Sequence, residues 1–257
     1  MKETANWDLI LGNLRCSITV YFECYRKIID ELNYGNNDVE LVKYMLHTKS
    51  FNAFSAALQL CEAGLHIESY NSIRLALENA WLALLMEDRS ELALEWLAMV
   101  APEKSFEKIV NRYRKRFGSP AWVRESLSHS KEDKEQRDKL YGVLSTKSHA
   151  NVASTFFPCY DGHGHEWLQF YGPGGIDDIK HKFKNLKAMK FCFGYVLKEV
   201  ETKRGKGNTI NWVYDEMEIV NIAGIAEEDE SGNLYVKPDN VNRKYQEMII
   251  LYRMIRK

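Results

Sequence analysis

Apolar residues recur at intervals of three and four along most of this chain, the pattern of helices with one buried face. The pattern predicts long helices over about 7–32, 38–63, 67–86, 131–149 and 177–202. Residues Ala80 to Met86 are apolar on every side, which marks the helix over 67–86 as the centre of the core. Shorter helices are expected over 90–100, 102–117 and 120–127, and a last one over 241–257.

Glycine and polar residues indicate where these helices end or bend. Gly64 predicts the end of the second helix, because glycine adopts the left-handed conformation that closes helices. The polar stretch His47–Ser50 predicts a bend within that helix, with Ser50 capping the restart. Residues 154–175 lose the helical period and accumulate Gly and Pro, which predicts a long loop.

The pattern changes after residue 205. Strand-like stretches near 218–226 and 234–236 predict a small β-hairpin that turns at Ser231, Gly232 and Asn233. The expected fold class is therefore all-α: an antiparallel helical bundle over 1–205, followed by a C-terminal β-hairpin and a helix over 206–257.

Composition adds little about partners. The formal net charge is −1, so whole-molecule charge predicts neither a nucleic acid nor a membrane as partner. Basic residues are concentrated over 180–206, however, and acidic residues over 215–230. The five cysteines are widely spaced, so we expect reduced thiols. The N-terminus is polar and the apolar runs are short, so we expect a cytoplasmic protein with no membrane span.

Four polar residues on two predicted helices form the main candidate site. Arg74 and Glu78 are four positions apart on one helix, and Ser145 and His149 are four apart on another, so each pair shares a helix face. His149 is a candidate general acid or base, oriented by Ser145, and Arg74 a candidate clamp for a phosphate or an oxyanion. The alternative is a closed hydrogen-bond network that only specifies the core.

Three lysines and one loop supply further candidates. Lys180, Lys184 and Lys187 are expected on the outward side of their helix, where they could bind RNA. The loop places four metal-ligand types close together, although one short loop rarely provides a complete metal site; these residues are Cys159, Asp161, His163 and His165. No phosphate-binding or dinucleotide-binding motif is found, so we expect neither a cofactor nor a resident metal.

An Arg-x-x-x-Glu helix followed by Tyr-x-x-Leu-Ser-x-x-x-His resembles uncharacterised bacterial families related to the HEPN superfamily. The resemblance covers about 51–200, and these residues carry it: Arg74, Glu78, Tyr141, Leu144, Ser145 and His149. It implies an antiparallel bundle, commonly dimeric, in phage-defence or stress settings, and often a metal-independent ribonuclease.

This chain departs from the HEPN pattern at one point. Many HEPN ribonucleases carry an arginine four to six residues before the histidine, and here those positions hold Val143, Leu144 and Ser145. Arg74 would then supply the arginine from a different helix.

Two classes of function follow. The first is a HEPN-like defence or stress protein that binds or cleaves RNA without metal, with a second copy of the chain as partner. The alternative is a non-catalytic helical module for dimerisation or for docking a protein partner.

Overall fold

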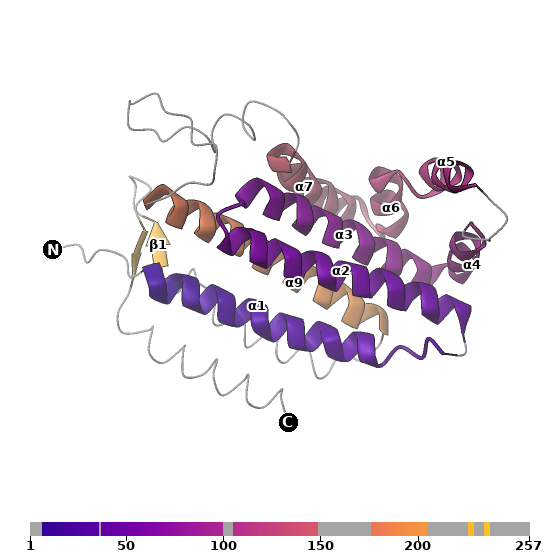
Figure 1. Cartoon of the computed structure of the whole chain (residues 1–257), viewed down its shortest axis with the longest axis horizontal. Coiled ribbons are helices and arrows are strands. Elements are labelled where there is room, and N and C mark those ends of the chain that lie inside the picture. Colours follow the sequence, from indigo (N-terminus) through magenta and orange to yellow (C-terminus); the bar gives the residue numbers. More distant parts are fainter. Residues whose placement is uncertain are drawn as a thin grey trace.

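The structure, a computed structural model, describes residues 7–35, 37–99, 105–148, 176–204, 226–228 and 234–236. Helices dominate this part of the chain and form an all-α bundle (Figure 1). The helices are α1 (Trp7–Asp30), α2 (Asp38–Glu62), α3 (His66–Asp88), α4 (Ser90–Ala98), α5 (Phe106–Arg116), α6 (Pro120–Leu127), α7 (Lys131–Ser148) and α9 (Ile176–Arg204).

Local sequence explains several helix ends. The Asn37 side chain accepts hydrogen bonds from the backbone N–H groups of Val39 and Glu40, which caps the start of α2. Gly64 follows α2 with a φ of 79°, a conformation that costs other residues energy because of their Cβ atom. In α6, Ser119 caps the first turn and Pro120 occupies a first-turn position where its missing N–H is not needed.

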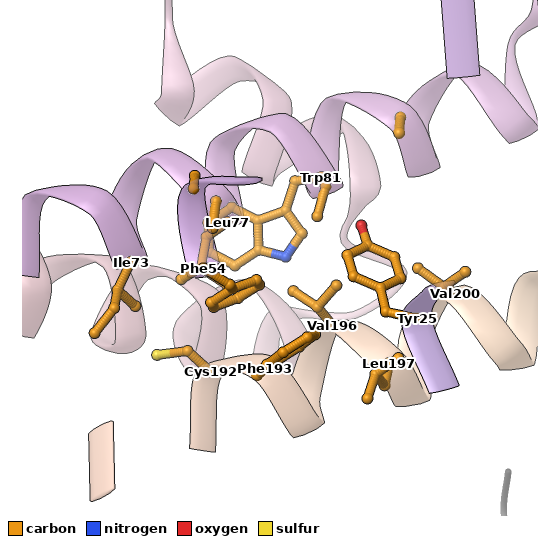
Figure 2. Close-up of a cluster of buried hydrophobic side chains, with 14 of the residues drawn as sticks. Tyr25, Phe54, Ile73, Leu77, Trp81, Cys192, Phe193, Val196, Leu197 and Val200 are labelled. Atoms are coloured by element: carbon orange, nitrogen blue, oxygen red, sulfur yellow. The ribbon is translucent and has the colours of Figure 1, made fainter. Parts of the chain in front are cut away.

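α3 lies at the centre of the bundle, between α2, α9 and α7 (Figure 1). Its residues from Ala80 to Met86 are all buried, as the sequence predicts. Figure 2 shows the Trp81 ring of α3 above the α9 side chains Val196 and Phe193. Burying such large apolar surfaces on several sides of one helix is the main source of stability in a bundle of this kind.

α9 supplies the opposite side of this core. Phe193 is fully buried and stacks on Phe54 of α2, with ring centroids 4.2 Å apart. It also meets three aromatic rings of α1 edge to face, a favourable geometry for aromatic pairs; these rings belong to Tyr21, Phe22 and Tyr25. One α9 residue therefore ties two other helices together.

The helices do not all alternate in direction. Trp7, at the start of α1, packs on Phe183, near the start of α9, and Arg204, at the end of α9, donates to the Ile28 carbonyl. α9 is therefore parallel to α1. The remaining long helices are arranged as the antiparallel prediction requires, since α2 runs opposite to α1 and α3 (Figure 1).

The predicted restart of α2 at Ser50 is wrong. The helix continues from Asp38 to Glu62, and both His47 and Ser50 are buried. Ser50 donates to the Ala76 carbonyl of α3, and His47 Nδ1 lies 2.8 Å from the Tyr25 hydroxyl of α1. These polar side chains bond across to neighbouring helices, so they join the helices and do not interrupt α2.

Two three-residue strands lie after the bundle, β1 (Ala226–Glu228) and β2 (Leu234–Val236). They pair antiparallel, with Ala226 opposite Val236. The turn expected at 231–233 lies outside the described residues, so the β-hairpin stays a prediction. The loop expected over 154–175 and the helix over 241–257 also lie outside them.

Candidate functional site

Arg74 and Glu78 of α3 meet Tyr141 of α7, and we call these three residues the open cluster. Arg74 Nε lies 3.7 Å from Glu78 Oε1, and the Tyr141 hydroxyl donates to the same oxygen at 2.9 Å. The Arg74 and Glu78 side chains are 23% and 29% exposed, so solvent reaches both. The sequence predicted the Arg74–Glu78 pair on one helix face, and the structure adds Tyr141 as the contact with α7.

Arg124 of α6 and Tyr113 of α5 lie near the open cluster. The Arg124 guanidinium lies 4.0 Å from the centroid of the Tyr141 ring, a cation–π contact, and its Nε donates to Asp138. Burial and the nearby Glu78 carboxylate raise the pKa of the Tyr141 hydroxyl. The pKa of Tyr113 on α5 is raised for the same two reasons. Tyr141 therefore remains a hydrogen-bond donor at neutral pH.

Ser145 follows Tyr141 by one helical turn on α7 and is partly buried, while Leu144 beside it is in the core. α7 ends at Ser148. His149 lies outside the described residues, so its pairing with Ser145 and Arg74 stays a prediction.

A second arginine–glutamate pair joins Arg137 of α7 to Glu199 of α9, and its side chains are more buried than those of Arg74 and Glu78. We call it the sealed pair. Arg137 is 4% exposed, and its Nη2 forms an ion pair with Glu199 of α9. Glu199 also accepts a hydrogen bond of 3.0 Å from the Trp81 indole N–H. Burial raises the pKa of Glu199, and the Arg137 charge opposes this shift.

The sequence pattern does not predict the sealed pair. Arg137 stands in a run of charged residues that resembles an exposed helix surface, and its partner is on a different helix far along the chain. Only the apolar neighbours of Glu199 on α9 hinted that its side chain faces inward.

The predicted RNA-binding lysines lie on α9. Lys184 and Lys187 are exposed, and Lys187 Nζ lies 5.8 Å from the centroid of Phe183, the ring that packs on Trp7 of α1. Among the described contacts, none joins these two lysines to the open cluster. The side chain of Lys180 lies outside the described residues.

Within the described ranges, no three His, Cys, Asp or Glu side chains converge as metal ligands. The loop candidates Cys159, Asp161, His163 and His165 lie outside these ranges. None of the described helices is long and apolar enough to cross a bilayer.

Comparison with models of known protein families, with curated proteins and with solved structures finds no match to this chain. The resemblance to the HEPN superfamily stays a prediction.

Proposed function

We propose that this chain is a HEPN-like defence or stress protein that binds RNA and cleaves it without a metal ion. In this proposal Arg74 binds a phosphate of the scissile linkage, and His149 transfers a proton with Ser145 as its orienting partner. Glu78 and Tyr141 hold Arg74 in place. A homodimer is the expected assembly.

The observation that carries the proposal is the exposure of the open cluster. A network that only specified the core would be closed, whereas about a quarter of the Arg74 and Glu78 side chains is in contact with solvent. The distance of 3.7 Å between Arg74 and Glu78 is also long for a charge-assisted hydrogen bond. A phosphate can therefore reach Arg74 from the solvent side, while Tyr141 continues to donate to Glu78.

The chemistry agrees with the residues available. An arginine beside a phosphate stabilises the charge that develops in the transition state, and the loss of one such donor costs about 10²- to 10³-fold in rate. A histidine acting as acid or base contributes about 10²- to 10⁴-fold. Neither role requires a metal.

The test is cleavage of a labelled RNA by the full chain in EDTA. We expect cleavage by the wild type, and a loss of about 100-fold or more in both Arg74→Ala and His149→Ala. The matched control is Arg26→Ala, which removes an exposed arginine that pairs with Glu23 on α1. Thermal unfolding of each variant separates a loss of chemistry from a loss of fold.

Three results would contradict this function: a wild type that leaves RNA intact, cleavage that stops in EDTA, or variants that cleave as fast as the wild type.

A second candidate function is docking of a partner, either a second copy of the chain or another protein. It is favoured by large apolar side chains that remain 42–50% exposed; these are Met45, Leu75, Leu94 and Val143. This function would be supported if light scattering on the pure protein gave a dimer that Val143→Lys or Leu75→Lys dissociates, and if the wild type left RNA intact.

A further inference from the structure

The outward face of α9 combines lysines with an exposed aromatic ring. Lys184, Lys187, Phe191 and Lys198 are all exposed, at spacings of three, four and seven residues that keep them on one side of a helix. We call these four residues the α9 face. With a rise of 1.5 Å per residue, it extends over about 21 Å.

The charges of α9 are sorted between its two sides. Over residues 181–204 the acidic residues are Glu199 and Glu201. Glu199 is held by Arg137 and Trp81, and Glu201 is 3% exposed. Both carboxylates thus face the bundle. The other two acids of α9, Asp177 and Asp178, lie in its first turn, ahead of the α9 face.

Phe191 distinguishes this surface from an ordinary solvated row of lysines. It is 65% exposed, more than any other large apolar side chain in the described part of the chain. The other two phenylalanines of this helix, Phe183 and Phe193, are buried. Lys187 precedes Phe191 by one turn and Lys198 follows it by two turns.

We propose that the α9 face binds single-stranded RNA, with phosphates on Lys184, Lys187 and Lys198 and an unpaired base stacked on Phe191. Exposed aromatic rings beside cations are the usual means of holding single strands without reading their sequence. In a duplex the bases are paired and stacked inside the helix, so no unpaired base is available to stack on Phe191. The proposed function supplies the choice of RNA, whereas the surface itself rests on charge and exposure.

Fluorescence anisotropy with a labelled oligouridylate of about 12 nucleotides tests this proposal. To keep the probe intact, every protein carries His149→Ala. We expect Phe191→Ala to weaken binding roughly 5- to 150-fold, because base stacking on an aromatic ring contributes that much. Phe191→Trp should bind as well as Phe191 does, and Phe191→Leu should resemble Phe191→Ala, since leucine is apolar but cannot stack.

The lysines have a separate readout. Replacing Lys184 or Lys187 by Ala should lower the slope of log affinity against log salt by about 0.7 each, the value for one phosphate contact on a single strand. Lys131→Ala and Leu94→Ala are the matched controls, because these side chains are 86% exposed on α7 and 50% exposed on α4. Both should leave affinity and slope unchanged. Since all these side chains are exposed, the variants should fold.

Several outcomes would overturn the proposal: equal affinity in Phe191→Ala and the wild type, equal affinity for a duplex of the same length, or binding of anionic vesicles without binding of the oligonucleotide. A DNA oligonucleotide of the same length shows whether the sugar matters, and tighter binding to DNA would also contradict the choice of RNA.

The outcomes separate this proposal from the ribonuclease function. If oligonucleotide binding depends on Phe191 and the protein does not cleave RNA, the ribonuclease function is contradicted and the role of the α9 face is supported. If cleavage depends on Arg74 and Phe191→Ala still binds fully, the ribonuclease function is supported and the role of the α9 face is contradicted.

Discussion

Two arginine–glutamate pairs have opposite environments: the sealed pair joins α7 to α9, and the pair of the open cluster lies on α3 and contacts α7 through Tyr141. In the sealed pair, Arg137 is 4% exposed and Glu199 also binds Trp81. In the open cluster, Arg74 and Glu78 are 3.7 Å apart and partly exposed, and Tyr141 lies just one turn beyond Arg137 on the same helix.

The difference shows what burial does to a pair of charges. A buried charge that loses its partner cannot be solvated by water, so breaking the sealed pair costs much of the stability of the fold. A pair in contact with water contributes little to stability and can exchange partners. Of the two pairs, the one in the open cluster therefore has the contact with solvent that binding of a charged ligand requires.

The largest expected effect comes from breaking the sealed pair. Arg137→Met leaves Glu199 buried without a cation, and we expect a loss of about 3 kcal/mol in the free energy of unfolding. Arg74→Met should cost less than about 1 kcal/mol, because its glutamate stays in contact with water. Urea unfolding of both variants measures the two values.

A companion variant checks the cause. Arg137→Met combined with Glu199→Gln should recover most of the lost stability, since glutamine is neutral and still accepts from Trp81. Equal losses in Arg137→Met and Arg74→Met would mean that the two pairs do not differ as described.

A second effect comes from the buried histidine of α2. Burial, with the nearby Arg204 and Lys43 charges, lowers the pKa of His47 from 6.5 to about 3. The unfolded chain then binds a proton that the folded chain does not, so stability decreases as the pH falls below about 6.5. Between pH 7 and pH 5 this contributes a loss of about 2 kcal/mol, and the loss continues to grow toward pH 3.

Urea unfolding at pH 7 and pH 5 measures the effect of His47. The difference between the two pH values should shrink by about 2 kcal/mol in His47→Gln. It should stay unchanged in His129→Gln, where the histidine is exposed. An unchanged difference in His47→Gln would show that another group accounts for the acid sensitivity.

The smallest expected effect is the difference between two tyrosine variants in the free energy of unfolding that they lose. Tyr25→Phe leaves His47 Nδ1 buried without its hydrogen bond, and we expect a loss of about 2 kcal/mol. Tyr141→Phe removes a bond to the partly exposed Glu78, where water can take its place, and should cost about 1 kcal/mol or less. This prediction would be refuted if thermal or urea unfolding showed a larger loss of stability in Tyr141→Phe than in Tyr25→Phe.

The apolar spacing in the sequence predicts most of this fold. It predicts α1 from Trp7, α2 from Asp38 and α6 over Pro120–Leu127, because local spacing and caps determine these bounds. It fails at His47 and Ser50, whose polar side chains resemble a helix break. Their partners, Tyr25 and Ala76, are 22 and 26 residues away, and local patterns do not contain such contacts.

The candidate site could be predicted only in part. The four-residue spacing of Arg74 and Glu78 is a local feature, and the structure retains it as an ion pair. The role of Tyr141 depends on how α7 packs against α3, which spacing does not determine. Phe191 was detectable, because it falls outside the buried spacing of α9 and on the same side as Lys184 and Lys187.

The parallel packing of α9 on α1 has a consequence for synthesis on the ribosome. The contact between Arg204 and Ile28 spans 176 residues, and at about 5–20 residues per second the ribosome needs roughly 10 to 35 s to make the intervening chain. During that time the aromatic side of α1, which meets Phe193 in the finished bundle, has no α9 to cover it. Phe51 of α2 can cover Phe22 and Tyr25 in part, but the side that meets Phe193 stays exposed, and we expect the nascent chain to depend on chaperones until α9 emerges.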